Sequence, residues 1–321
     1  MSLKEKRIYI AGSSGMVGSA IVRALTAKGF RDLVTRTSFD LDLTDQSATR
    51  AFFRNEKPEI VILAAAKVGG ILANNKFRAD FLYSNLMIEA NVIEAAIASG
   101  VEKLLFLGSS CIYPRLSTQP INEEALLTGP LEYTNEPYAI AKIAGIKLCE
   151  SYFRQYGSNF YSLMPTNLYG PNDNFDLATS HVIPALIRKF HEAKIDGRDT
   201  VSVWGTGLPR REFLYVDDLA EAVLFLMESI DAKDIYPTGT THVNIGFGKD
   251  IAISELADKI KDVVGFAGSV QFDADKPDGT PRKLLDISRI QNMGWSPRTE
   301  LEKGLTLTYE WFLSSLASLK T

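Results

Sequence analysis

Short apolar runs alternate with longer amphipathic segments through the first half of the chain. Runs rich in β-branched and other apolar residues predict strands at Arg7–Ala11, Leu33–Thr35, Ile60–Ala64, Lys103–Leu107 and Phe160–Leu163. Strands that alternate with helical segments are typical of a parallel sheet whose faces are covered by helices. The pattern therefore predicts an α/β fold for this half.

Between these strands, apolar residues recur at helical spacing. Val17, Ile21 and Leu25 stand at i, i+4 and i+8, so one stripe of the helix after the first strand should face the sheet. Longer helices are predicted at Asp80–Gly100, which ends at a glycine, and at Asn135–Tyr156.

After Pro165, glycines and prolines interrupt the pattern more often and the elements become shorter. The predicted helices are Ile183–Ala193, Asp217–Ser229, Ile253–Val264 and Leu301–Leu313, and the predicted strands are Ser202–Trp204, His242–Ile245 and Val270–Phe272. We therefore expect residues 1–165 to form one domain and residues 166–321 to form mainly a smaller α/β substrate domain. Some of the later segments are expected to rejoin the first sheet.

The composition is that of an ordinary globular protein, with 321 residues, 45% of them hydrophobic, and a formal net charge of -4. This charge argues against broad nucleic-acid binding. No apolar run approaches the length of a membrane span and the first residues carry no apolar signal segment, so we expect a cytoplasmic protein. Cys111 and Cys149 are too few for a disulfide framework and lack metal-site spacing, so no metal is expected.

A glycine-rich turn joins the first predicted strand to the first predicted helix. Its G-x-x-G-x-x-G spacing permits a tight turn and lets a pyrophosphate approach the helix N-terminus closely. Spacing alone is weak evidence, but strand, turn and helix follow in the order that dinucleotide binding needs. We therefore expect a Rossmann-type doubly wound parallel sheet. The residues expected at the cofactor are Gly12, Ser13, Ser14, Gly15, Met16, Val17 and Gly18.

The end of the second predicted strand bears on the type of nicotinamide cofactor. Arg36 stands where an acidic residue would favour a free ribose 2′-hydroxyl, so it favours the 2′-phosphate of NADPH, with Ser14 and Ser38 as further donors. The alternative is a solvated arginine at a strand end. Asp42 and Leu43 are candidates for contact with the adenine, although Asp42 would equally serve as a cap of the next helix.

Tyr138 and Lys142 stand four residues apart in a predicted helix, so their side chains emerge on the same face. A cation there lowers the cost of losing a phenolic proton, and we therefore expect Lys142 to lower the pKa of Tyr138. Tyr138 would then protonate the alkoxide that forms when hydride reaches a carbonyl. Ser109, after the fourth predicted strand, is the expected second donor to the carbonyl oxygen.

Motifs over nearly the whole chain resemble the extended short-chain dehydrogenase/reductases, and within them the epimerase/reductases of GDP-4-keto-6-deoxy-D-mannose. The motifs are A-A-A-K-V-G-G-I-x-A-N-N at Ala64–Asn75, L-G-S-S-C-I-Y-P at Leu107–Pro114, N-E-P-Y-A-I-A-K at Asn135–Lys142, M-P-T-N-L-Y-G-P at Met164–Pro171 and K-P-D-G-T-P-R-K at Lys276–Lys283. The glycine and Tyr/Lys motifs mark only the superfamily. The Ser-Ser-Cys motif and the segment 181–184, H-V-I-P, narrow the match.

The resemblance implies a role for each of these residues. Ser109, Tyr138 and Lys142 would form a reductase triad, while Cys111 and His181 would serve epimerisation. The residues implied on the nicotinamide side are Leu107, Gly108, Ser109, Ser110, Tyr138, Lys142, Pro165, Thr166, Asn167, Leu168 and His181. Those implied at the GDP-sugar are Ser109, Ser110, Cys111, Asn167, Lys189, Trp204, Arg211 and Asp278. The resemblance also suggests a homodimer built on the two long helices.

A 4-ketone explains why one site would carry both activities. It makes the hydrogens on C3 and C5 acidic, so two inversions and the later hydride transfer share one activated oxygen. Epimerisation must come first, because reduction removes the carbonyl. Inversion needs proton removal from one face and delivery to the other, and Cys111 and His181 both titrate near neutrality. Strand alternation would direct Ser109 and Cys111 to the same side.

Purely structural explanations are open for several of these residues. Cys111 fits a small buried residue, His181 fits the start of a helix, and Arg211 fits a solvated basic residue. Trp204 fits a core or loop residue, and Asp278 fits a turn residue.

Two other functions are compatible with the superfamily motifs. A nucleotide-sugar 4-epimerase would retain NAD and needs no separate base, and a 4,6-dehydratase needs an acid where Ser110 and Cys111 stand. A non-catalytic NADPH-binding regulator would have no reason to keep the whole catalytic set. The sequence thus predicts an NADPH-dependent enzyme that acts on a small nucleotide-sugar, with no nucleic-acid or membrane partner.

Overall fold

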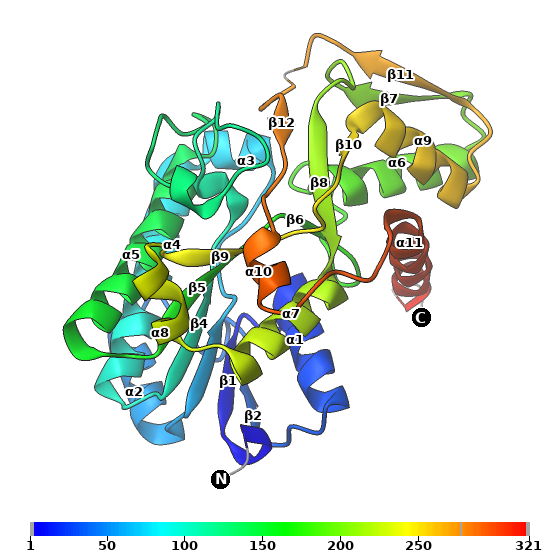
Figure 1. The fold of residues 1–321 in the computed structure, drawn as a ribbon. Coiled ribbons are helices and arrows are strands. Elements are labelled where there is room, and N and C mark those ends of the chain that lie inside the picture. Colours follow the sequence, from blue (N-terminus) through cyan, green and yellow to red (C-terminus); the bar gives the residue numbers. More distant parts are fainter. Residues whose placement is uncertain (1–2, 277, 319–321) are drawn as a thin grey trace.

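The computed structural model describes residues 3–276 and 278–318, which form a larger and a smaller region (Figure 1). The larger region contains a six-stranded sheet with the order β2-β1-β3-β4-β5-β9. Its strands are β1 (Ile8–Ala11), β2 (Leu33–Thr35), β3 (Ile60–Leu63), β4 (Lys103–Leu107), β5 (Phe160–Pro165) and β9 (His242–Ile245). Every neighbouring pair is parallel. The predicted α/β fold with a parallel, Rossmann-type sheet is confirmed.

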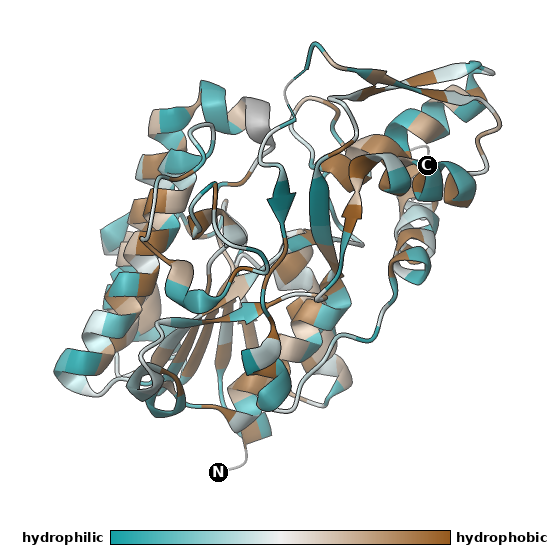
Figure 2. Ribbon diagram, turned by 45° about the horizontal axis from the view of Figure 1, so that its top comes forward, coloured by the Kyte–Doolittle hydropathy of each residue, from teal (hydrophilic) through white to brown (hydrophobic). Residues whose placement is uncertain are grey.

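Helices cover both faces of this sheet, as Figure 1 shows. They are α1 (Met16–Ala27), α2 (Gln46–Glu56), α4 (Arg78–Ala98), α5 (Glu136–Tyr156) and α7 (Val216–Ser229), with the shorter α3 (Ile71–Lys76), α8 (Ala232–Ile235) and α10 (Ser288–Asn292). Helix α1 packs against α7, while α4 packs against both α2 and α5. Ile21 and Leu25 are fully buried against the core, as the apolar stripe predicts. The apolar strands stand out as the brown interior of Figure 2.

The smaller region has its own hydrophobic core. Its helices are α6 (Val182–Ile195), α9 (Ile253–Val264) and α11 (Leu301–Ser318), and its strands are β6 (Asn167–Tyr169), β7 (Thr200–Trp204), β8 (Arg210–Tyr215), β10 (Asp250–Ala252), β11 (Ser269–Asp273) and β12 (Arg282–Lys283). Strand β8 pairs with β6, β10 and β12, whereas β7 pairs with β11. The hydrophobic pattern did not predict β8, because its first residues are Arg210, Arg211 and Glu212.

Glu212 fastens the smaller region to the main sheet. Its side chain is fully buried, and its carboxylate accepts hydrogen bonds from the backbone N–H of Gly248 at 2.7 Å and of Leu285 at 3.0 Å. Its backbone oxygen accepts a hydrogen bond from Asn167 Nδ2 at 2.8 Å. A buried carboxylate needs such partners. Strand β8 is thereby held at the end of β5, with segments that follow β9 and β12.

Gly12 and Gly18 allow α1 to begin directly against the preceding turn. A Cβ atom at Gly18 would lie 2.1 Å from the carbonyl oxygen of Gly12 and 2.7 Å from Cα of Ser13. Gly12 has a φ of 83°, and a Cβ atom there would lie 2.7 Å from the backbone nitrogen of Ala65. Both positions therefore require glycine. At Gly18 the reason is the close contact, and at Gly12 it is both the close contact and the positive φ.

We predict that Gly18→Ala lowers the free energy of unfolding by about 3 kcal/mol, because the backbone of the turn must shift to admit a methyl group. Gly100→Ala is the matched control. It has a φ of 76° but no atom within 4 Å of the added Cβ, so only backbone strain of about 1 kcal/mol is expected. Urea denaturation followed by circular dichroism measures both values. Equal losses in the two variants would contradict the importance of the close contact.

Candidate active site

The predicted site residues gather where the strands of the main sheet end. Gly12 follows β1, Ser109 lies two residues after β4, and Thr166 follows β5. Helix α5 packs beside β4 and β5 and carries Tyr138 and Lys142. In open α/β sheets, ligands bind outside the carboxyl ends of the strands. The fold thus brings the glycine turn and the reductase triad to the same edge.

The glycine turn leaves the N-terminus of α1 without a side-chain cap. Gly15 is the N-cap residue in an extended conformation, and its N–H donates to the carbonyl of Gly12 at 3.1 Å. Ser14 is exposed beside it, while Met16 and Val17 are partly buried. The first N–H groups of an uncapped helix are suited to an anion such as a pyrophosphate. The predicted cofactor turn therefore has the required form.

Arg36 is held at the end of β2 by three contacts. It forms an ion pair with Glu56, donates to the carbonyl of Thr35 at 2.7 Å, and lies over the ring of Phe52 at 5.5 Å. Its side chain is still 37% exposed. Ser38 lies exposed nearby in sequence. Arg36 is therefore a fixed and accessible cation, not a freely solvated one.

In the described part of the chain, the side chain of Asp42 makes hydrogen bonds only with Thr44. Its carboxylate accepts from the backbone N–H at 2.9 Å and from the hydroxyl at 2.7 Å, and these bonds lower the pKa of Asp42. The expected cap of the next helix is wrong, because Asp45 caps α2 by accepting from the N–H of Ala48 at 3.0 Å. Leu43 is buried beside it.

The segment after β4 does not continue as a strand. Residues Ser110–Ile112 form a turn of 3-10 helix, and Ser109 caps it by accepting a hydrogen bond from the N–H of Cys111 at 3.3 Å. The expected alternation from Ser109 to Cys111 is therefore wrong. The capping bond instead holds the Ser109 hydroxyl against the backbone of Cys111.

Lys142 is buried, with 1% of its surface exposed, and its ammonium is fully engaged. Nζ lies 3.0 Å from Oε1 of Glu89 and donates to the carbonyl oxygen of Leu107 at 3.0 Å. It also lies 5.8 Å from the ring centroid of Tyr138. The sequence predicted that Tyr138 and Lys142 lie together, but it gave no sign that Glu89 on α4 forms an ion pair with Lys142.

The pKa of Tyr138 is raised, not lowered as expected. Burial is the main cause, and the charges of Cys111 and Glu89 add to it, while a hydrogen bond with Ser109 works in the opposite direction. The expectation failed first because the phenol is buried, and also because Glu89, which pairs with Lys142, adds to the rise. The phenol is therefore a protonated hydrogen-bond donor at neutral pH.

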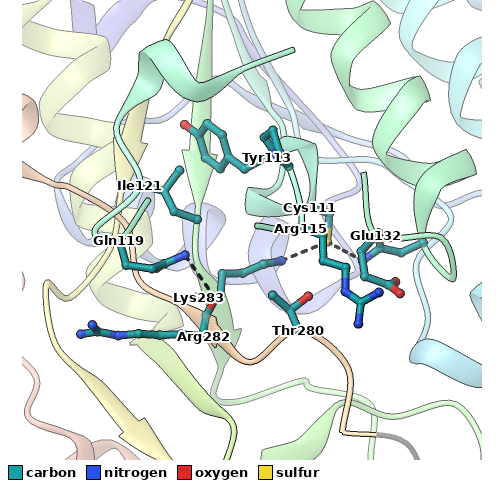
Figure 3. Close-up of a pocket in the computed structure, with 11 residues that line it drawn as sticks. Cys111, Tyr113, Arg115, Gln119, Ile121, Glu132, Thr280, Arg282 and Lys283 are labelled. Carbon is teal, nitrogen blue, oxygen red and sulfur yellow. Dashed lines mark hydrogen bonds between the residues drawn. The ribbon is translucent and has the colours of Figure 1, made fainter. Parts of the chain in front are cut away.

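Cys111 is partly buried between two donors that the motifs contain but that sequence reasoning did not single out. Asn135 Nδ2 lies 3.4 Å from Sγ, and Lys283 Nζ lies 3.7 Å from it. Figure 3 shows Lys283 directed at the thiol from the far side of a pocket that Arg115 and Thr280 also line. The sulfur therefore faces an amide donor and a cation.

His181 is the N-cap residue of α6 and makes no side-chain capping bond. It is exposed to solvent, yet the protein around it removes part of its hydration, and this desolvation lowers its pKa. The charge of Lys283 lowers the pKa further. The segment before it is fixed by a hydrogen bond from the N–H of Gly70 to the carbonyl of Thr179 at 2.9 Å. Lys283 thus acts on both the thiol and the imidazole.

The residues predicted on the nicotinamide side have different surroundings. Leu107 ends β4, and Gly108 follows it in contact with Met164, where a Cβ atom would lie 2.4 Å from the sulfur. Thr166 and Asn167 direct their side chains to the backbone oxygen of Glu212. These two residues therefore hold β8. Pro165 ends β5, Leu168 lies in β6, and Ser110 is buried.

A second group of predicted residues lies on β7 and α6. Trp204 is 46% exposed, and the Nζ atoms of Lys189 and Lys276 lie 5.4 Å and 5.9 Å from its ring centroid. Lys189 also donates to the carbonyl of Ser202 at 3.1 Å, and burial lowers its pKa. Trp204 is therefore an exposed aromatic face flanked by two cations, not a core residue. Lys276 was missed, although it opens the last of the quoted motifs.

Asp278 joins two loops at the edge of this group. Its carboxylate accepts from the N–H of Thr206 at 2.7 Å and from the hydroxyl of the same residue at 2.8 Å. Arg211 reaches the same loop by donating to the backbone oxygen of Asp278 at 3.5 Å, and burial lowers its pKa. Arg211 is not a solvated residue. Pro277, in the same motif, lies outside the described residues.

Comparisons with known proteins identify the family of this chain. The NAD dependent epimerase/dehydratase family matches residues 8–246. The chain is 58% identical to a GDP-L-fucose synthase of Sinorhizobium fredii over 98% of each chain. It is 56% identical to GDP-L-fucose synthase 1 of Arabidopsis thaliana over 99% of this chain and 96% of that protein.

Among solved structures, a GDP-D-glycero-L-gluco-heptose synthase of Campylobacter jejuni, determined in the presence of NADPH, superposes with a TM-score of 0.91. It is 41% identical and the match covers 98% of this chain and 100% of that one. The predicted relationship to the extended short-chain dehydrogenase/reductases is confirmed. The chain belongs to the NAD dependent epimerase/dehydratase family and, within it, to the group of the GDP-L-fucose synthases.

Proposed function

We propose that this chain converts GDP-4-keto-6-deoxy-D-mannose to GDP-L-fucose, by epimerisation at C3 and C5 followed by reduction of the 4-keto group with NADPH. The observation that carries the proposal is Lys283, whose ammonium lies 3.7 Å from the Cys111 thiol and whose charge also lowers the pKa of His181, while Ser109, Cys111 and Glu89 all act on the phenol of Tyr138. A reductase alone would need only the triad. Relatives of nearly the same length, at 56% to 58% identity, are GDP-L-fucose synthases.

The residues of the first βα turn fit NADPH. The uncapped N-terminus of α1 would hold the pyrophosphate, and the absence of a Cβ at Gly12 and Gly18 keeps the turn tight. Arg36 would hold the 2′-phosphate, exchanging part of its contact with Glu56 for it. When bound, NADPH supplies the hydride that reduces the carbonyl.

Epimerisation would use the thiol and the imidazole on opposite faces of the sugar ring. Ser109 and Tyr138 donate hydrogen bonds to the 4-keto oxygen and stabilise the enolate that each deprotonation forms. The lowered pKa of His181 keeps the imidazole neutral and able to accept a proton near pH 7. Lys283 stabilises the negative charge that Cys111 carries when it has given up its proton.

Reduction would follow at the same oxygen. Tyr138 gives its phenolic proton to the oxygen as the carbonyl is reduced, and Ser109 remains hydrogen-bonded to it. The raised pKa of Tyr138 means that the phenol keeps its proton through both inversions. Lys142 faces the phenolate that is left after the transfer.

The GDP moiety would lie on the smaller region. Trp204 presents an exposed ring for the guanine, and Lys189, Lys276 and Arg211 supply positive charge for the diphosphate. Asp278 would act mainly by holding the Thr206 loop in place. A 4-epimerase or a 4,6-dehydratase would leave the Cys111, His181 and Lys283 arrangement without a use.

We also propose a homodimer and a reducing, cytoplasmic location. Tyr83 on α4 and Ile140 on α5 are 64% and 43% exposed, and the two helices pack side by side. Such large exposed side chains on adjacent helices suit a two-fold helix bundle.

A free thiol at Cys111 suits a compartment that keeps cysteines reduced. In the described residues, no helix is both long and apolar enough to cross a membrane. Sedimentation at micromolar concentration tests the dimer.

The activity itself is tested by loss of NADPH absorbance with and without GDP-4-keto-6-deoxy-D-mannose, in deuterium oxide. We expect oxidation of NADPH only with the sugar, and deuterium at both C3 and C5 of the product. Oxidation without deuterium at these carbons would make the chain a reductase alone.

Cys111→Ser should reduce deuterium incorporation at C3 and C5 by about 100-fold or more, the scale of a lost general acid or base. Oxidation of NADPH should fall much less and yield a reduced sugar that has not been inverted, because the reductase triad is intact. Cys149→Ser, at a fully buried thiol in α5, is the control and should incorporate deuterium normally. Equal loss of inversion and reduction in Cys111→Ser would refute the division of labour.

Tyr138→Phe should lower the rate of hydride transfer by about 100-fold or more while NADPH binds with unchanged affinity. The substitution removes only the proton donor and leaves the ring in place. Stopped-flow absorbance measures the transfer, and fluorescence titration measures the binding. Near-normal turnover would remove Tyr138 from the role of acid.

The pH dependence of C3 and C5 exchange should report His181. Because its pKa lies below the ordinary 6.5, exchange should stay constant as pH falls to 6.5 and decline only below it. Lys283→Gln removes a charge that lowers this pKa, so the decline should begin at a higher pH. Lys276→Gln, beside Trp204, is the control and should leave the profile unchanged, because Lys276 has no effect on the pKa of His181. An unshifted profile in Lys283→Gln would contradict the coupling.

A further inference from the structure

Glu89 is a buried carboxylate that the proposed reaction does not yet use. It lies in the middle of α4, with 2% of its surface exposed, and Oε1 is 3.0 Å from Nζ of Lys142. In the described part of the chain, neither oxygen has a hydrogen-bond partner besides this ammonium. A buried carboxylate with so few partners is costly. Its position therefore calls for a reason other than stability.

The surroundings are shaped to admit this carboxylate. Gly145 on α5 faces it, and a Cβ atom there would lie 2.9 Å from Oε2 of Glu89 and 2.5 Å from Cζ of Phe106. The Phe106 ring in turn lies 4.6 Å from Nζ of Lys142. The missing side chain at Gly145 thus provides the space in which the carboxylate, the ring and the ammonium meet.

We propose that Glu89 is a positioning residue of the reductase site, whose carboxylate compensates the Lys142 ammonium and fixes it beside Tyr138. The proposal rests on the function inferred above and adds a fourth member to the triad. A buried ammonium without a counter-charge tends to lose its proton or to move toward water. Either change would deprive Tyr138 of the cation that faces the phenolate formed during reduction.

The pair of Glu89 and Lys142 should also make the rate of hydride transfer depend on pH. Burial raises the pKa of Glu89 to about 7, against the opposing effect of Lys142. Tyr138 and Cys149, both on α5, are the other titratable groups whose pKa responds to Glu89. On the α2 side, Arg50 is paired with Glu94 and lies at the surface. Protonation of Glu89 below this pKa would uncover the ammonium, so hydride transfer should slow as pH falls through about 7.

The test compares the rate of hydride transfer as a function of pH in the wild type, Glu89→Gln and Glu94→Gln. NADPH deuterated at the transferred position isolates this step through its isotope effect. We expect Glu89→Gln to lower kcat by about tenfold, with KM for NADPH and sugar nearly unchanged, as for loss of a partner that orients a site residue. The decline near pH 7 should vanish in Glu89→Gln, persist in Glu94→Gln, and return in Glu89→Asp. A decline that persists in Glu89→Gln would overturn the proposal.

Infrared difference spectra of the protein without substrate provide a second readout. The carbonyl band of a protonated carboxylic acid should appear in the wild type as pH falls through about 7, and be missing from Glu89→Gln. If Glu89→Gln does not fold, Glu89→Asp provides the assignment. With carbon-13 glutamate the band should shift in the wild type but not in Glu89→Asp, because the aspartate does not carry the label, and this distinguishes Glu89 from the buried Glu123 and Glu212. Absence of the band would refute the titration of Glu89. A band in a protein that reduces no GDP-4-ketosugar would refute the proposed function instead.

Discussion

The burial of one ammonium group organises this molecule. Lys142 lies between the end of β4 and the centre of α4, and its three donors face a backbone carbonyl, a carboxylate and an aromatic ring. Breaking such a pair by removing one partner costs about 3 to 5 kcal/mol, so the positions of α4, α5 and β4 are mutually constrained. Tyr138, the proposed proton donor, is carried by the same helix as the ammonium. The position of Tyr138 is therefore fixed by the buried ion pair of Lys142 and Glu89.

The pairing of Lys142 with Glu89 lets the phenol of Tyr138 meet two opposite requirements, which an unpaired cation would not. In the proposed reaction, the phenol donates a hydrogen bond and keeps its proton during inversion, and it releases that proton during reduction. A compensated ammonium leaves the pKa of Tyr138 raised by burial, which suits the first demand. The ammonium still faces the phenolate when the proton leaves, which suits the second. The buried pair of Lys142 and Glu89 is therefore consistent with inversion followed by reduction at one site.

The sequence predicted those features that depend on local pattern. Apolar runs place the strands of the main sheet to within a residue or two, and the glycine spacing gives the turn at α1. Strand β8 was missed because Arg210, Arg211 and Glu212 carry charges that only tertiary contacts explain. The geometry between Ser109 and Cys111 was wrong because a hydroxyl cap outcompetes strand continuation. Glu89 gave no signal, since nothing within its own helix indicates that it meets Lys142.

The charge near the proposed substrate site differs in sign from the net charge of the chain. The chain is acidic, with a net charge of -4, yet Lys189 and Lys276 flank Trp204, Arg211 contacts the backbone of Asp278, and Lys283 lies beside Cys111. A diphosphate responds to the field inside a cleft, where low-dielectric walls concentrate it, and not to the overall charge. Lys283 lies 3.7 Å from the sulfur of Cys111 and lowers the pKa of His181, so the positive charge of the proposed diphosphate site extends to the two groups proposed for proton transfer.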